Sequence, residues 1–472
     1  AASHRRCSMP HRNMFRTWHG EERALDPAAL EPLRSAVQGD VRAPGDAGYD
    51  EARAVWNGTI DRHPALIVAA QTIQDVQRVV AFAQQHQIVL AVRGGGHSFA
   101  GHSTCDGGIV LDLAQMRHLR VDPARRLAVA GPGLRWADLD TATQQHGLAV
   151  TGGQISHTGI AGLTLGGGIG WLARQHGLTV DHLVGADIVT ADGALRRAGP
   201  DADADLYWAI RGGGGNFGIA TAFTYQLQAI GPDVSVCQLA FPIEAAAQVF
   251  PEAEELLEAS PPSLSATFVF LTAPEGVPVA ALTLVSTASS DQALHSFAPF
   301  RRLGTPVFEE IVRVPYTALQ RMLDQVAAPG LRYYGRGNFL DTLDPPVIEP
   351  LARAYTETPS PQSLVLFVRL GGAVATVPPE ATAFAHRNRP WAVTVLAIWR
   401  DPADDDANRA WIERAWQALP ALPKAVYVNE LGDEGNERVR AAYGPNYERL
   451  SQLKRRYDPD NLFRLNQNIV PA

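Results

Sequence analysis

Four glycine-rich stretches constrain this chain more than any other feature, and the longest reads TGGQISHTGIAGLTLGGGIG at residues 151–170. The others lie at 94–101, at 211–218 and, more weakly, at 131–133. Glycine tolerates positive φ and lets backbone N–H groups approach a ligand closely. A run of such groups forms a nest for an anion such as pyrophosphate. One loop of this kind is equally well explained by a tight turn at a strand end, but several together favour a nucleotide cofactor.

The string GGGNFG at 213–218 matches the G-x-G-x-x-G fingerprint of dinucleotide-binding folds, but its context does not. That fingerprint needs a helix directly after it. The segment that follows, IATAFTYQL, has the two-residue period of a strand. The chain also has no G-x-x-x-x-G-K-[ST], G-x-S-x-G or H-E-x-x-H motif. We therefore expect neither a Rossmann fold nor a P-loop, and we predict no metal site.

Charge and composition argue against several partners. The net charge is −8 and the isoelectric point is about 6.0, whereas nucleic acids and anionic membranes require clustered Lys and Arg. No apolar run reaches the length of about 18 residues that a membrane span needs. Three widely spaced cysteines, Cys7, Cys105 and Cys237, give no disulfide framework. The sequence carries no signal of oligomeric state.

The first twenty residues, AASHRRCSMPHRNMFRTWHG, are basic and lack the apolar segment of a signal peptide. We expect residues 1–13 to form a tail ahead of the first domain. A cytoplasmic protein is the simplest expectation, although a secreted chain whose signal had been removed would carry the same sequence.

Residues 40–228 are expected to alternate strands and helices. Apolar residues recur on one helical face over 72–87, and the apolar run 88–92 predicts a buried strand that leads into the first glycine loop. Further predictions are a strand over 107–116, a strand and helix start over 127–139, and a hairpin over 186–198.

The pattern changes after Gly231-Pro232. Strand-like runs at 265–273, 280–288, 363–374 and 391–399, with few helices between them, predict an α+β domain on one antiparallel sheet. One helix-like segment spans 244–258, and Pro251 is expected to break or kink it. The last residues, 447–472, predict an amphipathic helix followed by a polar tail.

Four long motifs resemble the berberine-bridge-enzyme-like FAD-linked oxidases of the vanillyl-alcohol-oxidase superfamily. They are RGGGHSFAGHSTCDGGIVLDL, the glycine loop continued to VGADIVTADG, DLYWAIRGGGGNFGIAT and YGPNYERLSQLKRRYDPDNLFRLNQNIVP. The resemblance implies an α+β fold: a two-part PCMH-type FAD-binding domain with an inserted substrate domain built on an antiparallel sheet flanked by helices. The boundaries it suggests are 20–228 for the FAD-binding domain, 229–425 for the substrate domain and 426–472 for a segment that returns to the first domain.

By this resemblance the histidine of RGGGH, His97, is bonded covalently to the 8α-methyl of FAD. Many relatives add a cysteinyl bond to the flavin, but the matching position here is Ile155, and Cys105 lies in the wrong loop. The resemblance therefore implies a single bond, through His97 only. The other residues it assigns to the cofactor are Arg93, Gly94, Gly95, Gly96, Ser98, Gly153, Ile155, Ser156, Thr158, Gly159, Gly162, Gly168, Gly218, Ile219, Asn466 and Asn468.

The segment AVYVNELGDE at 425–434 holds the candidate catalytic residues. Read as a strand, it places Tyr427 and Asn429 on one face and Glu430 on the other. The resemblance assigns the catalytic position to Glu430, which ionises readily at neutral pH, whereas a tyrosine has an ordinary pKa near ~10. A solvated carboxylate at a strand end explains Glu430 equally well. Tyr333 and Tyr334 are further candidates to border the substrate cavity, although core packing is the commoner role of a buried tyrosine pair. Arg336 is a candidate to bind a carboxylate or sugar oxygens of the substrate.

The resemblance implies an FAD-dependent oxidase. Such an enzyme removes a hydride from an alcohol or amine carbon, delivers it to flavin N5 and reduces O2 to H2O2. The alternatives are a flavin dehydrogenase with another electron acceptor, and a flavin-binding or tailoring protein without turnover. A small molecule and O2 are the expected partners. Relatives act on sugars, alkaloids and polyketides, and this sequence shows no pattern that selects among them.

Overall fold

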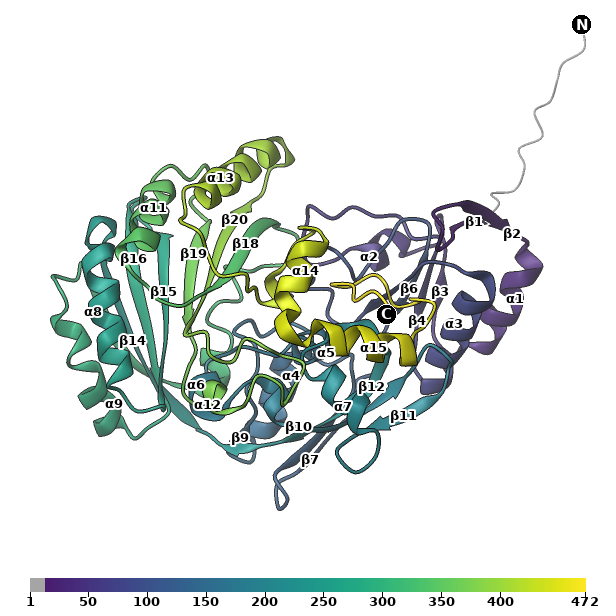
Figure 1. Cartoon of the computed structure of the whole chain (residues 1–472), viewed down its shortest axis with the longest axis horizontal. Helices are drawn as coiled ribbons and strands as arrows, with labels where there is room; N and C mark the ends of the chain where they lie inside the picture. The colour runs from purple at the N-terminus through teal and green to yellow at the C-terminus, as the bar shows by residue number, and fades with distance from the viewer. Residues whose placement is uncertain (1–12) are drawn as a thin grey trace, which may run out of the picture.

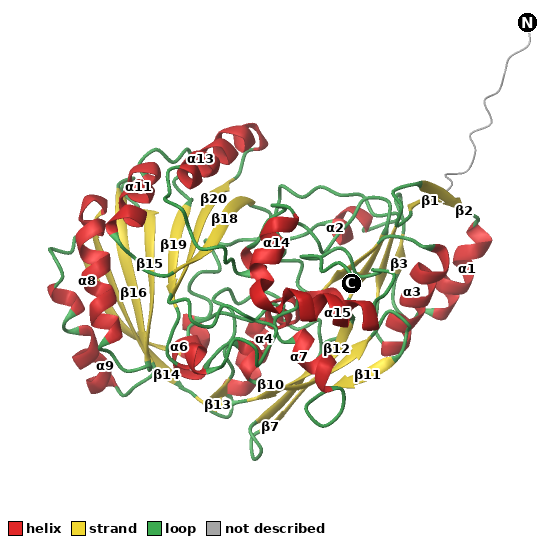
Figure 2. Ribbon diagram, in the orientation of Figure 1, coloured by secondary structure: helices red, strands yellow, loops and turns green. Residues whose placement is uncertain are grey.

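The computed structural model describes residues 13–472. The predicted basic tail and Cys7 therefore lie outside the described residues, apart from Asn13, which begins β1 (Asn13–Arg16). In the part of the chain that is described, no helix has the length and apolarity to cross a membrane. Strands and helices are both abundant, and the α+β fold class predicted from the sequence is confirmed (Figures 1 and 2).

The first sheet has the order β3-β4-β6-β5, and its last three strands are parallel. Its strands are β3 (Val41–Arg42), β4 (Leu66–Ala69), β6 (Ile109–Asp112) and β5 (Leu90–Arg93). The predicted helix, α3 (Ile73–His86), connects β4 to β5 and begins with a capping box between Thr72 and Asp75. The glycine loop 94–98 starts at the carboxyl end of β5. Parallel open sheets bind ligands at this end of their strands.

The second sheet is antiparallel, with the order β11-β10-β12-β8-β7. Its strands are β7 (Leu119–Asp122), β8 (Leu127–Ala130), β10 (Leu183–Val189), β11 (Leu195–Ala198) and β12 (Ile219–Gln226). The β10–β11 pair is the predicted hairpin. Strand β12 follows GGGNFG directly, so the rejection of a dinucleotide fingerprint is also confirmed.

Residues 233–399 form a seven-stranded antiparallel sheet with the order β17-β14-β16-β15-β19-β20-β18. Figure 2 shows helices along its outer side, opposite the rest of the molecule. The outer face of the sheet packs against these helices through a single large apolar core. The elements are β14 (Asp233–Pro242), β15 (Leu264–Thr272), β16 (Pro278–Ser286), β17 (Phe308–Pro315), β18 (Arg332–Leu340), β19 (Leu364–Arg369), β20 (Trp391–Trp399), α8 (Ala246–Glu258), α9 (Ser290–Phe297), α11 (Pro345–Tyr355) and α13 (Asp405–Gln417).

Pro251 does not break α8, and that part of the sequence prediction is wrong. The helix is continuous through the proline. A proline inside a helix removes one hydrogen bond and costs about 3 kcal/mol. Val249, Phe250, Ala253 and Leu257 are all buried against the sheet, and each large apolar side chain contributes roughly 1.5–3 kcal/mol when buried. Burial of this face therefore outweighs the local penalty.

The remaining elements are short or lie at the ends of the chain. They are β2 (Glu22–Leu25), α1 (Pro27–Ala36), α2 (Tyr49–Arg53), α4 (Trp136–Gln144), β9 (Leu148–Ala149), α5 (Ile160–Leu165), α6 (Ala173–His176), α7 (Ala204–Ile210), β13 (Gln228–Ala229), α10 (Tyr316–Leu319), α12 (Ala373–Thr376), α14 (Asn436–Tyr443) and α15 (Tyr447–Tyr457).

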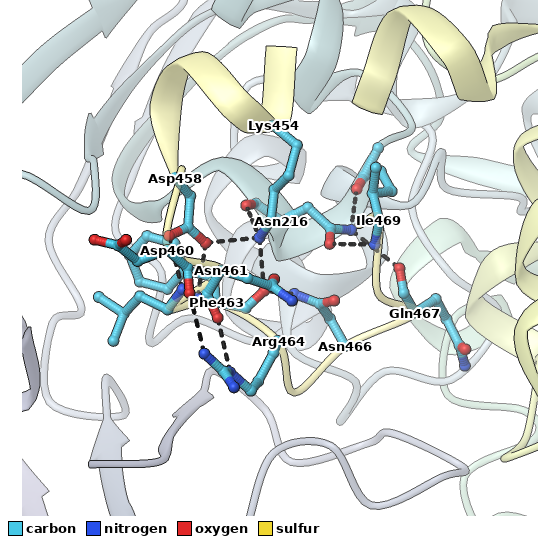
Figure 3. A network of polar contacts seen from close by, with 12 residues as sticks. Asn216, Lys454, Asp458, Asp460, Asn461, Phe463, Arg464, Asn466, Gln467 and Ile469 are labelled. Carbon is cyan, nitrogen blue, oxygen red and sulfur yellow. Dashed lines mark hydrogen bonds and ion pairs between the residues drawn. The ribbon is translucent and has the colours of Figure 1, made fainter. Parts of the chain in front are cut away.

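The C-terminal helix α15 lies against the first half of the chain and contacts α7 (Figure 1). A buried ion pair anchors it (Figure 3). The Lys454 ammonium donates to Asp458 Oδ2 at 2.6 Å and to the backbone carbonyls of Asn216 and Phe463 at 2.8 and 2.9 Å. The Asp458 carboxylate also accepts from the N–H groups of Leu462 and Phe463 at 2.7 and 2.9 Å. This network fixes the polar tail against the loop at 213–218.

Lys454→Met should lower the free energy of unfolding by about 3–5 kcal/mol, the usual cost of removing one partner of a buried ion pair. The substitution leaves the Asp458 carboxylate without its cation and the Asn216 carbonyl without the hydrogen bond from Lys454. Denaturant titration followed by tryptophan fluorescence measures the change. Lys424→Met is the matched control, because Lys424 and its partner Glu437 are 86% and 85% exposed and such surface pairs contribute roughly 0–1 kcal/mol. Equal effects of the two substitutions would contradict the structural role of Lys454.

Candidate active site

One cavity of about 550 Å³ lies between the glycine loops and the inner face of the seven-stranded sheet. The loop after β5, the loop that leads into α5 and the segment around residues 427–431 line one side of it. Strands β15, β19 and β20 line the other. The motifs that the sequence singled out therefore meet at one enclosed space.

The first two glycine loops touch backbone to backbone. A Cβ atom placed on Gly95 would lie 2.3 Å from the Gly159 nitrogen, and one on Gly159 would lie 2.4 Å from the Gly95 nitrogen. No real Cβ atom approaches this closely. Glycine is needed here for close approach rather than for an unusual φ, and the contact brings two sets of backbone amides to the same edge of the cavity.

Gly95→Ala should destabilise the protein by about 1–3 kcal/mol, the usual range for overpacking, because neither backbone segment is free to move without the other. A thermal or denaturant melt measures the loss. Gly199→Ala is the control: Gly199 is buried and Gly95 half-buried, but a Cβ on Gly199 would meet only the Val184 carbonyl oxygen at 4.0 Å. A Gly95→Ala protein as stable as the control would show that the loops separate at no cost.

His97 faces the cavity directly after these glycines. Its ring stacks on Trp56 at a centroid distance of 4.5 Å, and its Nε2 lies 2.8 Å from Nδ1 of His157. Burial, together with the nearby charges of His157 and Arg135, lowers the pKa of His97 to about 3. The imidazole is therefore neutral at pH 7 and keeps a nucleophilic nitrogen lone pair.

Sequence reasoning missed His157 and Trp56 as partners of His97. His157 lies in the quoted glycine loop two residues after Ile155, so a second histidine near the cofactor was a signal that could have been used. Trp56 is far from every motif. Its indole packs between His97 and Tyr333, with a centroid distance of 3.9 Å to the tyrosine ring, and no local pattern indicated this contact.

The segment 425–434 is not a strand, and the prediction that it is one is wrong. Its centre, Val428–Glu430, is a 3₁₀ turn. The turn brings Tyr427, Asn429 and Glu430 to the cavity together, whereas a strand would have separated them. Tyr427 determines this geometry, because its hydroxyl oxygen accepts from the N–H of Gly168 at 3.0 Å and from Asn429 Nδ2 at 2.8 Å.

Tyr427 and Glu430 differ in their ability to take a proton. Burial raises the pKa of Tyr427 to about 12, although the hydrogen bonds it accepts work in the opposite direction. Burial also raises the pKa of Glu430, to about 7, against the effect of a 2.6 Å hydrogen bond from Thr394 to Oε2. Among the described residues no donor contacts Glu430 Oε1. Glu430 is therefore the cavity group that exchanges a proton near neutral pH.

Tyr334 does not belong to this site, which corrects the sequence prediction. Alternate residues of β18 point to opposite faces, and Tyr334 lies on the outer face, where its hydroxyl donates to Glu413 of α13 at 2.8 Å. Arg336 lies on the same face and pairs with Glu413 at 2.9 Å. Tyr333 points inward but is buried against Trp56 and does not line the cavity.

Most of the residues assigned to the cofactor by resemblance do line the cavity. They are Gly94, Gly95, Gly96, His97, Ser98, Gly153, Ile155, Thr158, Gly159, Gly162, Gly218, Ile219 and Asn466. Gly162 leaves open space where a side chain would point. The side-chain oxygen of Asn466 is buried with no hydrogen-bond partner among residues 13–472, which marks a place for a ligand donor.

Four assigned residues do not line the cavity, and three of them support a residue or loop beside it. Arg93 pairs with Asp112 at 2.7 Å. Ser156 donates from its N–H and its hydroxyl to Asp324 at 2.8 and 2.6 Å. Gly168 has a φ of +84° and holds Tyr427. Asn468 has a buried side-chain oxygen with no partner among the described residues.

Within the described residues, the cavity has neither a cysteine in its lining nor a cluster of metal-ligating side chains. Cys105 is buried outside the cavity, and burial raises the pKa of its thiol to about 12. Cys237 is buried in the core of the seven-stranded sheet, and burial raises its pKa to about 12. Within residues 13–472 no three His, Cys, Asp or Glu side chains gather closely enough to hold a metal ion.

Comparison with known proteins gives the family. The FAD binding domain family model matches residues 64–199, and the model described as berberine and berberine-like matches residues 426–470. An FAD-linked oxidoreductase of Dictyostelium discoideum is 33% identical over 439 residues, which are 92% of this chain and 95% of that protein.

Solved structures agree with this assignment. A crystal structure of 6-hydroxy-D-nicotine oxidase from Arthrobacter nicotinovorans superposes with a TM-score of 0.83 at 27% identity, covering 93% of this chain and 99% of that one. A xylooligosaccharide oxidase from Myceliophthora thermophila, in complex with xylobiose, shares the fold with a TM-score of 0.84 at 24% identity, covering 94% and 99%. The chain belongs to the berberine-bridge-enzyme-like FAD-linked oxidoreductases.

Proposed function

We propose that this protein is an FAD-dependent oxidase of alcohols, with FAD attached through His97 alone and Glu430 as the catalytic base. The observation that carries the proposal is the meeting at one cavity of a neutral His97 and of Glu430, whose pKa is raised to about 7. The family supplies the cofactor, and the residues present fit it.

The fit rests on two features of the cavity. The contact between Gly95 and Gly159 creates an edge of exposed amides without side chains, which suits the pyrophosphate of FAD. The unpartnered oxygen of Asn466 is free to accept from an N–H group of the cofactor. His97 Nε2 is held by His157, so Nδ1 is the nitrogen left for a covalent bond. At the position where many relatives carry a second bonding residue, Ile155 has no group able to form one.

FAD held by the glycine loops and His97 would supply the two-electron chemistry of an alcohol oxidase, namely hydride acceptance from the substrate carbon and reduction of O2. Glu430 then has one task, to take the proton of the substrate hydroxyl as the carbonyl forms. Its Oε2 is held by Thr394, and within residues 13–472 no donor contacts its Oε1, so one oxygen positions the carboxylate and the other is free for the substrate. The balance is R₂CH–OH plus O2 giving R₂C=O plus H2O2.

A panel of alcohols tests the function. Under air, a substrate should release H2O2 in step with its oxidation. Without oxygen, the same substrate should bleach the yellow flavin absorption. Bleaching with no oxygen consumption under air would favour the dehydrogenase alternative, and no bleaching by any alcohol or amine would refute the proposed activity.

A further inference from the structure

We infer that the substrate is an uncharged, largely apolar alcohol and not a sugar or a carboxylate-bearing molecule. The inference rests on the proposed function and adds the substrate class. The inference is argued from the residues that line the sheet side of the cavity. The glycine loops line the opposite side.

The inner face of this sheet is apolar at its centre. Strand alternation sends one set of residues to the helix-packed core and the other set into the cavity. On the neighbouring strands β15, β19 and β20 that second set is aliphatic apart from Thr267 and Thr394. The side chains of Leu364 and Leu366 are half-buried and line the cavity. On β20 they pair with Leu396 and Thr394. The apolar patch consists of Val269, Leu271, Leu364, Leu366, Leu396 and Ile398.

Polar groups on this face are few, and two of them already have a hydrogen-bond partner. Gln238, Thr283 and Thr267 form one row in register across β14, β16 and β15. Thr267 already accepts from Gln154 at 3.3 Å, and Thr394 already donates to Glu430. Burying a hydroxyl without a hydrogen-bond partner costs binding free energy. An oligosaccharide carries many hydroxyls and would leave most of them unpaired against the aliphatic patch.

Charge complementarity points the same way. Among the described residues that line the cavity there is no Lys or Arg. Arg336, the one guanidinium that the sequence suggested for this role, faces Glu413 on the opposite side of the sheet. A substrate carboxylate or phosphate would enter without a cation and beside Glu430, the lone acidic side chain of the described lining. One hydroxyl near Glu430 and an apolar remainder fit the groups that are present.

The test uses the full-length protein with its flavin and three probes. They are 4-isopropylbenzyl alcohol, 4-(hydroxymethyl)benzoate, which replaces the apolar group with a charge, and xylobiose. We expect the apolar alcohol to bleach the flavin anaerobically with a kcat/KM at least about tenfold above that of either other probe, since one uncompensated polar group is enough for such a factor. A carboxylate or sugar that reacts as well as or better than the apolar alcohol overturns the inference and leaves the oxidase proposal intact.

Equilibrium binding of the same probes, followed by perturbation of the flavin absorption, separates the two proposals. If no probe bleaches the flavin and only the apolar alcohol binds, the oxidase function fails and the ligand class stands. If all three bind equally, the ligand class fails. Leu366→Asn should weaken binding of the apolar alcohol severalfold, while Leu294→Asn, at a leucine that is 47% exposed on α9, should not. Equal binding to both variants would also count against the inference.

Discussion

His97→Ala should abolish the covalent attachment of FAD. The wild-type chain, denatured and weighed intact, is expected to carry the added mass of one FAD, and the variant is expected to have the mass of the bare polypeptide. The reason is local: the His97 imidazole lines the cavity directly after the three glycines and is neutral (pKa about 3), and at Ile155 no nucleophile is present to replace it. The variant solution retains a yellow colour if FAD still binds without a bond.

A cysteine variant and peptide mapping of the wild-type protein supply the controls for this result. Cys105→Ser should keep the full added mass, because the Cys105 thiol lies outside the cavity and its pKa of about 12 keeps it protonated. FAD found on a cysteine peptide of the wild type would contradict the single bond. So would an added FAD mass that survives in His97→Ala.

Most of the glycine loops that line the cavity could be located from the sequence, because a cluster of glycines is a local signal. Gly95 and Gly159 have to be glycines because their backbones touch. A glycine can be recognised in the sequence without any knowledge of the fold. The assignment of His97 rests on the resemblance of its RGGGH motif to that of the family. The position of His157 in the second glycine loop is a local signal too, but its pairing with His97, 60 residues away, becomes visible only in the fold.

The candidate catalytic residues show where sequence reasoning stops. Residues 425–434 alternate like a strand, but Tyr427 bonds to Gly168, 259 positions away, and this contact favours a turn instead. Tyr334 was misplaced for a different reason. Both faces of β18 are covered, one by helices and one by the first half of the chain, so alternation alone does not say which face borders the cavity.

Glu430→Gln should lower the rate of substrate oxidation by about 10²- to 10⁴-fold, the usual contribution of a positioned general base. Substrate affinity should change little, because glutamine has the same size and still accepts the hydrogen bond from Thr394. Anaerobic stopped-flow measurement of flavin bleaching gives both quantities. Glu437→Gln is the matched control at an exposed glutamate (85%) nearby in sequence. A near-normal rate in Glu430→Gln would rule out Glu430 as the base.

The pH profile tests the same residue without removing it. The deprotonated carboxylate is the active form, so the wild-type rate should rise with pH and level off above the Glu430 pKa of about 7. The hydrogen bond from Thr394 stabilises the charged carboxylate and lowers this pKa. Thr394→Val should therefore move the midpoint of the rise to higher pH, with a plateau rate close to that of the wild type. A midpoint that stays in place, or moves to lower pH, would mean that another group titrates, because removal of a donor to a carboxylate shifts its pKa in one direction only.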